Sequence, residues 1–464
     1  MMLDAATRAR REALVAGHSG GTLLEVLALL IHGPVLGALS QHLRSGRGRG
    51  RGRGEWRFPL VMDAALLVVP LVLCVTVLSD WIVESLALWT ATLLLTVLLG
   101  GITSSNSRSA TLYSSPAVSS LNSYTLAARS FKGLNVLLVA LCILAVDFSA
   151  FPRRFCKTEA RGLALMDLGA ATTIAAGGLL SRATTCPNAR HSARSTAGWR
   201  GQDAVVVLLG LARWLGVRIL NYQQPQSEYG CNWNFFFTIA CVAACARALP
   251  PVGAASRGLL GAAIVVAHQA ALSTTPLTAF ILSADRSPAA ALPRLSLELL
   301  SVWHSDREGL VSVLVMLAVL LLSQAAGALY CRRCSADEAA GFRAWPLMPP
   351  LLLMGLYAAC RQLDPPSRRL GNAAHVAAVG AAVCAVLSAF LVLPLAADNG
   401  ALLGLLSDHA LVVFAAANAL TGLVNVTLDT ARVSDSQAVG LLCVYAGLLV
   451  ATARLFERRA AVKY

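Results

Sequence analysis

Residues Ala145–Glu159 read AVDFSAFPRRFCKTE, and this stretch decides how the rest of the chain is interpreted. A long apolar run ends at Asp147, an aromatic turn with Pro152 follows, and three cations and Glu159 come shortly after it. An ionised side chain inside a bilayer costs about 2.5–3.5 kcal/mol on insertion scales, so charge in such a setting indicates function. We therefore interpret this stretch as the reactive rim of a membrane enzyme.

The composition of the chain is that of a membrane protein. Hydrophobic residues make up 56% of the 464 residues and charged residues only 13%, whereas soluble domains carry roughly 25% charge. Apolar runs close to the ~20 residues that cross a bilayer recur along the chain, and we expect an all-α polytopic membrane protein of about 13 transmembrane helices. These helices form a single predicted domain over residues 1–464. Their placements are near 22–43, 58–79, 82–101, 128–147, 162–181, 203–220, 234–249, 258–275, 309–330, 344–360, 371–394, 402–426 and 437–455.

Arginine distribution predicts the orientation in the membrane. The segment 46–54 alternates Gly and Arg, and together with Arg44 and Arg57 it predicts a flexible cytosolic loop. Two basic clusters, Arg153–Arg161 and Arg361–Arg369, then fall on the opposite side. Because basic residues retained on that side usually have an anionic partner, both clusters are candidates for a binding site.

The formal net charge of +14 does not require a nucleic-acid partner. Basic cytosolic loops that lie on anionic membrane lipids account for it, and the Gly–Arg segment lacks the interleaved aromatic residues of single-strand binders. We expect membrane lipids as partners and no nucleic acid.

Polar residues gather in five segments that this topology places on the same, non-cytosolic side. Interfacial anchoring and helix capping explain any one of them, but their convergence favours a shared site. The segments are Asp147–Asp167, Asn221–Thr238, Asp306–Gly309, Ser367–Asn372, and the pair Asn425 and Asp429.

The side chains in these segments suit a phosphoglycolipid. Arginine offers forked donors for phosphate, aromatic residues offer flat amphipathic surfaces for a sugar ring or an interface, and amides bind hydroxyls. The candidates are Arg153, Arg154, Arg368 and Arg369 for phosphate, Tyr222, Tyr229 and Trp233 for the ring, and Asn232 and Asn234 for hydroxyls.

No motif in the chain supplies an activated nucleophile. Cys156 has no His beside it in sequence, and His268 and His375 lie within predicted spans. Asp147 is the better candidate base, because burial at the end of an apolar helix and a nearby cation can tune the pKa of a carboxylate.

Long ordered strings in the chain resemble a known family. The strings are AVDFSAFPRRFCKTEARGLALMDLG from Ala145, YQQPQSEYGCNWNFFFTIA from Tyr222, DREGLVS, SRRLGN and NALTGLVNVTLDT. They are similar to those of the inositol acyltransferase family of glycosylphosphatidylinositol (GPI) anchor biosynthesis. The opening GHSGGTLLEV resembles the N-terminal motif of that family, with Gly20, Thr22 and Glu25 in register.

The resemblance implies a multi-pass enzyme of the endoplasmic reticulum membrane. Such an enzyme transfers a long acyl group, typically palmitoyl, from acyl-CoA to the 2-hydroxyl of inositol in glucosaminyl-phosphatidylinositol. It implies no metal and no permanently bound cofactor, with acyl-CoA as co-substrate.

The same resemblance assigns roles to the residues of the site. Asp147 is expected to act as the general base, and Lys157 to orient it or to stabilise the oxyanion. Glu159 and Asp167 are expected to orient the cations. Glu228, Arg307, Asn425 and Asp429 complete the predicted substrate-binding set.

Three alternatives remain open from the sequence. A glycolipid transporter or scramblase would also line a polar cavity with charge, although the chain shows no internal repeat. A His-dependent membrane-bound acyltransferase would move catalysis to His268 or His375. A subunit that only scaffolds partners would tolerate alanine throughout the polar segments.

Overall fold

The computed structural model describes residues 17–45, 57–105, 120–181, 184, 201–219, 226–250, 252–285, 304–336, 344–393 and 401–462. The predicted Gly–Arg loop at 46–54 and Tyr222 lie outside these residues.

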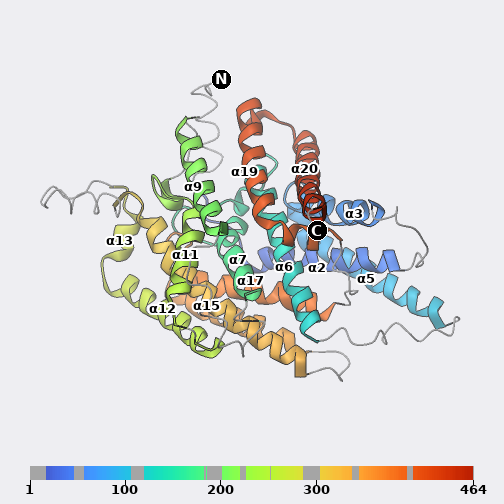
Figure 1. Ribbon diagram of the computed structural model, residues 1–464, viewed down its shortest axis with the longest axis horizontal. Coiled ribbons are helices and arrows are strands. Elements are labelled where there is room, and N and C mark those ends of the chain that lie inside the picture. Colours follow the sequence, from blue (N-terminus) through green and yellow to red (C-terminus); the bar gives the residue numbers. More distant parts are fainter. Residues whose placement is uncertain are drawn as a thin grey trace, which may run out of the picture.

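Helices form most of the described chain (Figure 1), and the predicted all-α class is confirmed. Each of the predicted spans coincides with one helix or with two or three consecutive helices. The helices are α2 (Leu23–Ser45), α3 (Arg57–Asp63), α4 (Val69–Cys74), α5 (Ile82–Ser105), α6 (Ser120–Ala145), α7 (Leu165–Leu179), α9 (Gly201–Ile219), α10 (Gln226–Tyr229), α11 (Phe235–Ala248), α12 (Ala254–Thr274), α13 (Leu277–Leu282), α15 (Arg307–Ala336), α16 (Met348–Leu363), α17 (Ala373–Val392), α18 (Ala401–Asp408), α19 (Ala410–Thr427) and α20 (Asp435–Val462).

Within the described residues, 8 helices are long and apolar enough to cross a bilayer. They are α2, α5, α6, α12, α15, α17, α19 and α20. The apolar segments Leu60–Cys74, Leu165–Leu179 and Phe235–Ala248 are shorter, and α9 carries Asp203, Arg213 and Arg218. The polytopic helical architecture is therefore established, whereas the number of crossings stays a prediction.

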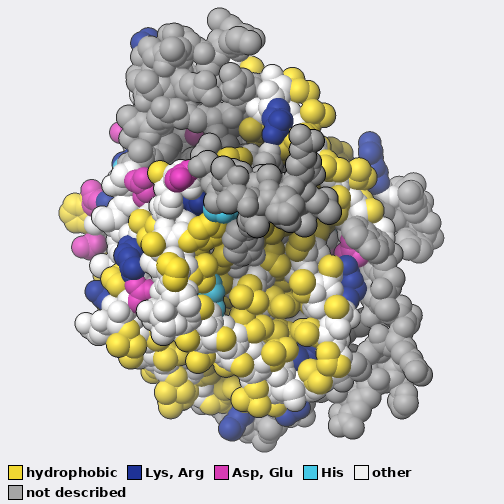
Figure 2. All heavy atoms as spheres, turned by 90° about the vertical axis from the view of Figure 1, so that its left-hand side faces the viewer, with side chains coloured by type: hydrophobic (Ala, Val, Ile, Leu, Met, Phe, Trp, Pro, Cys, Tyr) yellow, Lys and Arg dark blue, Asp and Glu magenta, His cyan; other side chains and the backbone are white. Residues whose placement is uncertain are grey.

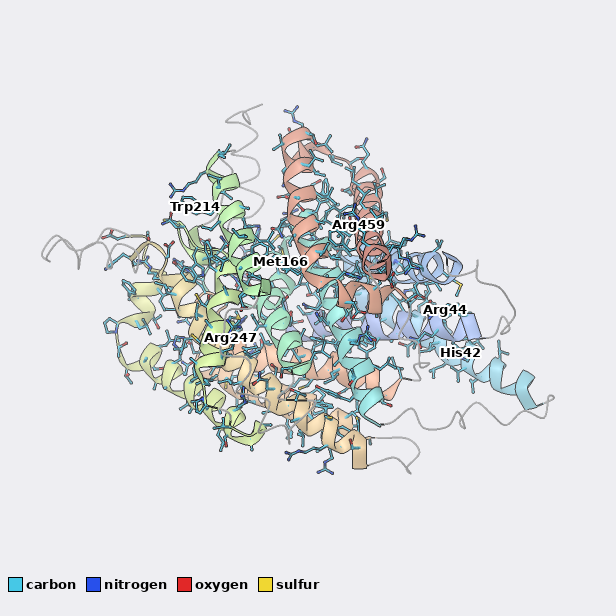
Figure 3. The ribbon with its side chains drawn as sticks, in the orientation of Figure 1. His42, Arg44, Met166, Trp214, Arg247 and Arg459 are labelled. Carbon is cyan, nitrogen blue, oxygen red and sulfur yellow. The ribbon has the colours of Figure 1, made fainter. Side chains whose placement is uncertain are left out.

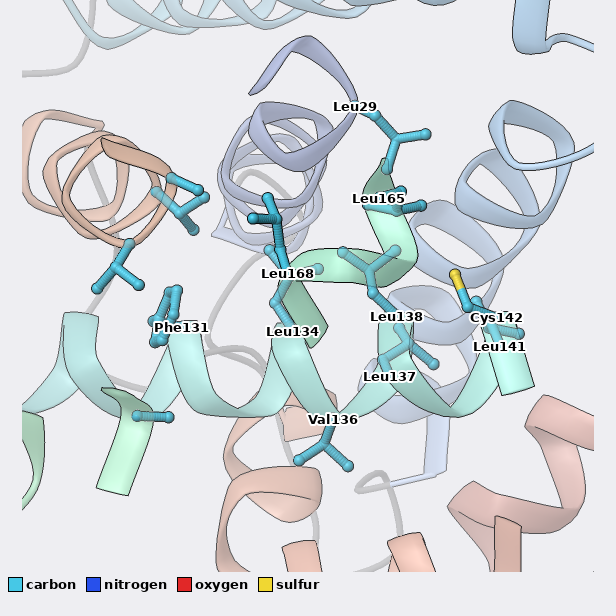
Figure 4. Packing of buried hydrophobic residues seen from close by; sticks show 14 of the residues in the cluster. Leu29, Phe131, Leu134, Val136, Leu137, Leu138, Leu141, Cys142, Leu165 and Leu168 are labelled. Carbon is cyan, nitrogen blue, oxygen red and sulfur yellow. The ribbon is translucent and has the colours of Figure 1, made fainter. Parts of the chain in front are cut away.

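Helix α6 is the centre of the packing. It contacts α7, α15, α17, α18, α19 and α20. Apolar side chains recur along it at helical spacing and point towards α2 and α7, while Val136 points the opposite way (Figure 4). Leu134, Leu138 and Cys142 lie on the side of Leu168, Leu165 and Leu29, and Phe131 points to the same side nearer the other end of the helix.

The outer helices present apolar side chains to the surroundings. Leu259 and Val266 of α12 and Leu208 of α9 are exposed. The face seen in Figure 2 carries a broad apolar area with few charged side chains. A surface of this kind fits contact with lipid rather than with water.

Small residues allow α6 to approach its neighbours closely, as is common between membrane helices. A Cβ on Gly133 would collide with the backbone carbonyl oxygen of Leu403 on α18 and would lie 2.9 Å from the Leu403 Cα. Gly177 of α7 faces open space, with nothing within 4 Å of an added Cβ.

We predict that Gly133→Ala destabilises the protein by about 1–3 kcal/mol, because backbone cannot move aside as a side chain can. Gly177→Ala serves as the control, since both substitutions gain about 1 kcal/mol of helix propensity and only one creates a collision. The measurement is the melting temperature of each purified variant in detergent. Equal melting temperatures for the two variants would contradict the close α6–α18 contact.

Candidate functional site

The turn after α6 is held in place by buried aromatic rings. Phe148, Phe151 and Phe155 are fully buried, and the rings of Phe151 and Phe155 meet edge to face at 6.1 Å. Asp147 therefore lies just after α6, at the start of a turn that these buried rings pack into the protein.

Arg153 and Arg154 bind protein groups next to this turn. The Arg153 guanidinium donates to the carbonyl oxygens of Val146 (3.1 Å) and Phe148, which follow the C-terminus of α6. Cations are favoured there because the last carbonyls of a helix carry partial negative charge. Arg154 pairs with Glu25 at 2.5 Å and with Asp80 at 2.7 Å, so it joins the start of α2 to the turn before α5. Their predicted role as phosphate ligands stays a prediction.

Asp167 connects three segments from a fully buried position. Its carboxylate accepts hydrogen bonds from the amide nitrogens of Thr158 (3.1 Å) and Ala164 (2.9 Å) and from the Thr158 hydroxyl (3.0 Å). Arg368 Nε donates to the same carboxylate at 3.1 Å. The predicted orienting role of Asp167 fits these contacts, and its partner among the cations is Arg368.

Glycines let the N-terminal segment reach the same region. Gly20 and Gly162 have φ values of 81° and 127°, and a short parallel bridge joins Gly20 to Leu163. The Gly21 amide donates to the Leu163 carbonyl at 2.8 Å. The motif around Gly20 and Glu25 is therefore part of the scaffold of the site.

The five polar segments meet as predicted. Arg369 pairs with Glu308 at 2.9 Å, and the Asn232 amide donates to Asp306 at 2.7 Å. Asn425 Nδ2 donates to Asp147 Oδ2 at 2.7 Å. The last contact joins α19 to the turn that follows α6, and the first two join the start of α15 to the loops before α17 and α11. The bond from Arg368 to Asp167 ties the loop before α17 to the segment after that turn.

Several predicted binding residues have structural contacts. Arg307 is fully buried and donates to the carbonyl oxygens of Asp285 (2.8 Å) and Ser283. Trp233 Nε1 donates to Thr238 (2.9 Å), and the Asn234 side chain caps α11. Asp429 pairs with Arg432 (3.3 Å), and Glu159 is exposed, with its amide bonded to the His18 carbonyl.

A cavity of about 780 Å³ runs beside α6 and has a polar end. Its apolar wall extends from Phe131 to Val146, which is about 22 Å along a helix. The polar end contains Asp147, Lys157, Glu228, Tyr229, Asn234 and Arg368. Met166 of α7 also lines it and lies between α9 and α19 in Figure 3.

Lys157 is paired at this polar end. Its Nζ lies 2.7 Å from Glu228 Oε2. Burial raises the pKa of Glu228, but the Lys157 ammonium and the Arg368 guanidinium outweigh it and hold the pKa below the ordinary 4.5. Glu228 is therefore ionised at neutral pH and fixes the position of the ammonium.

The histidines of the alternative mechanism lie elsewhere. His268 Nε2 contacts the Leu370 carbonyl oxygen at 2.8 Å, and neither His268 nor the buried His375 lines the cavity. Across the described ranges no three His, Cys, Asp or Glu side chains are grouped to hold a metal ion. The expected metal-free chemistry stays a prediction.

Sequence comparison identifies the family. The GWT1 family model matches residues 7–456. The chain belongs to the GWT1 family. It is 29% identical to GPI-anchored wall transfer protein 1 of Aspergillus oryzae, over 98% of this chain and 99% of that protein. It is 28% identical to the Schizosaccharomyces pombe protein of the same name, over 68% of each chain. Identity to the phosphatidylinositol-glycan biosynthesis class W protein of Dictyostelium discoideum is 26%, over 68% of this chain and 70% of that protein.

The structure adds residues to this GWT1-family site whose partners the sequence did not predict. Glu25 and Asp80 hold Arg154, and Asp364 pairs with Arg161. The N-terminal motif was the only available signal for Glu25. Asp80 is distant in sequence from Arg154, and Asp364, within the Arg361–Arg369 cluster, is distant from Arg161, so only the folded chain brings them to their partners.

We predict that Glu228→Gln lowers the melting temperature, because it leaves the partly buried Lys157 without its partner at a cost of about 1–3 kcal/mol. A lowered carboxyl pKa stabilises the fold above the unfolded-state value and stops doing so as pH falls through the folded-state value. The difference from wild type is therefore constant at neutral and weakly acidic pH and disappears below pH 4.5.

The measurement is thermal unfolding in detergent across this pH range. Glu159→Gln is the control, because this exposed carboxylate contributes little. A Glu228→Gln variant with the wild-type melting temperature at pH 7 would show that the Lys157–Glu228 pair does not stabilise the fold.

Proposed function

We propose that this protein acts in GPI-anchor biosynthesis as an inositol acyltransferase. Membership of the GWT1 family and the names of its relatives support this role. The proposed reaction moves a palmitoyl group from acyl-CoA to the 2-hydroxyl of inositol in glucosaminyl-phosphatidylinositol. The proposed location is the endoplasmic reticulum membrane.

The observation that carries the proposal is one elongated apolar cavity with ionisable groups at one end. An extended chain advances by roughly 1.3 Å per carbon, because a C–C bond is about 1.5 Å long. A chain of about sixteen carbons therefore spans roughly 20 Å, close to the length of the α6 wall. In this proposal the methyl end of the acyl chain lies near Phe131, and the thioester lies beside Asp147 and Lys157.

In the proposed mechanism, Asp147 removes the proton of the inositol hydroxyl as its oxygen attacks the thioester carbonyl carbon. The new C–O bond forms, the C–S bond breaks, and the proton passes to the departing CoA thiolate. Asn425 holds the Asp147 carboxylate by its 2.7 Å hydrogen bond. Lys157, fixed by Glu228, supplies positive charge for the developing oxyanion.

Charge at the polar end favours a phosphorylated substrate. Arg368 lines the cavity, and Asp167 orients it through Nε. We assign the phosphate contact at this end to Arg368, and no permanently bound cofactor enters the proposal. Transport and scaffolding by the same chain have no specific observation in their favour.

We predict that Asp147→Asn lowers acyl transfer by about 10²–10⁴-fold, the usual contribution of a general base. The amide oxygen can still accept the Asn425 hydrogen bond, so the melting temperature stays near that of wild type. The assay uses membranes with glucosaminyl-phosphatidylinositol and palmitoyl-CoA. His268→Ala and His375→Ala test the alternative, and the reverse pattern of losses would favour a His-dependent mechanism.

We also predict that Phe131→Leu shifts chain preference towards donors longer than palmitoyl-CoA. Phe131 lies at the far end of the cavity wall, and shortening it makes room for added methylenes. Each methylene in an apolar pocket is worth roughly 10-fold or more in specificity.

The measurement is kcat/KM for stearoyl-CoA relative to palmitoyl-CoA. Val136→Ala is the control, because this buried α6 residue points away from Phe131 and Leu134 (Figure 4). An unchanged ratio in Phe131→Leu would place the methyl end elsewhere.

A further inference from the structure

One side of the cavity is bounded by two helices that do not pack against each other. Leu209, Ala212 and Val217 of α9 line it, and so do Ala415 and Ala419 of α19. Helix α9 packs on α11, and α19 packs on α6 and α20, whereas the backbones of α9 and α19 hardly approach along their described length. We call this boundary the α9–α19 seam.

Glycines at the seam face open space. Gly216 of α9 and Gly422 of α19 both line the cavity, and a Cβ added to either would meet nothing within 4 Å. Ala212 and Ala419 are exposed. The seam is therefore lined by small side chains, and few backbone contacts cross it.

The outer surfaces beside the seam are apolar. Leu208, Leu211 and Leu215 are exposed on α9, and Leu423 and Val426 are exposed on α19. Such surfaces fit the hydrocarbon of a bilayer, so a molecule that enters between these helices comes from the lipid phase.

Arg213 bridges the seam. It interrupts the apolar run VVVLLGLARWLGV in α9, it is exposed, and it lines the cavity. Its guanidinium donates to the side-chain oxygen of Asn418 on α19, which also lines the cavity. Asn418 is a neutral acceptor, so this bond does not neutralise the arginine, whose charge also acts on Glu228 at the polar end of the cavity. An arginine in such an apolar setting indicates a functional contact.

We propose that the α9–α19 seam is the lateral portal through which the phospholipid acceptor enters, and that Arg213 contacts its phosphodiester. The guanidinium exchanges the Asn418 carbonyl oxygen for phosphate oxygens, which its forked donors match better. The glycerolipid tails remain among the apolar surfaces of α9 and α19, and the headgroup reaches Lys157 and Arg368. The inference rests on the proposed function for the identity of the lipid, but the portal is tested by binding alone.

The first test fills the seam without disturbing the fold. Gly422→Phe puts a ring into open space beside the cavity, and Gly447→Phe puts one on the outside of α20, where an added Cβ also meets nothing within 4 Å. The full-length protein in nanodiscs is exposed to photoactivatable phosphatidylinositol, and the crosslinked fraction is measured.

We expect Gly422→Phe to lose most of the crosslinking and Gly447→Phe to retain it, with melting temperatures matching wild type. Wild-type crosslinking in a folded Gly422→Phe variant would overturn the portal. Because this readout needs no turnover, a missing acyl-transfer activity would refute the proposed function and leave the portal in place.

The second test separates a phosphate contact from a simple bridge between helices. Arg213→Gln and Asn418→Ala both remove the charged bond across the seam. We expect Arg213→Gln to weaken phosphatidylinositol binding by about tenfold, the effect of one lost charge-assisted hydrogen bond, and Asn418→Ala to weaken it less.

Binding of palmitoyl-CoA is measured in parallel, and we expect Arg213→Gln to leave it unchanged. Equal losses of lipid binding in the two variants would show that Arg213 only bridges α9 and α19, and would overturn its assignment as a phosphate contact. If Arg213→Gln weakened only the binding of palmitoyl-CoA, Arg213 would contact a phosphate of the acyl donor instead of the lipid, and the proposal would be overturned.

Discussion

The site depends on one buried carboxylate. Asp167 has no access to solvent and is stable there only because amide, hydroxyl and guanidinium donors surround it. Through these bonds it fixes Thr158, the neighbour of Lys157, and it orients Arg368. Asp167 thus positions Arg368 directly and the backbone next to Lys157, although it does not line the cavity itself.

Cations in this part of the chain divide into two groups according to their partners. Arg153, Arg154 and Arg307 bind protein carbonyls or carboxylates and tie segments together. Lys157 and Arg368 also have protein partners, but they face the cavity. Arginine therefore joins structural segments at some positions and lines the candidate site at others. Whether the side chain faces the cavity distinguishes these two roles.

Much of the fold could be predicted from the sequence, because the long helices are apolar runs that carry their own signal. The contacts among the polar segments agree with the convergence that arginine distribution predicted, whereas the side of the membrane on which they lie stays a prediction. The individual pairings were not, because several arginines and carboxylates are equivalent in sequence and only the tertiary path brings Arg154 to Asp80 or Arg161 to Asp364. The number of crossings stays a prediction for another reason: α9 contains enough charge to blur the difference between a span and a surface helix.

Helix α6 belongs both to the core of the protein and to the wall of the cavity. Any molecule with a long alkyl tail that fills the cavity will therefore stabilise the folded state by mass action, in proportion to the logarithm of its concentration over its Kd. Detergents are such molecules. The choice of detergent during purification thus sets the starting occupancy of the cavity, and a tightly held detergent tail will compete with any lipid that binds there.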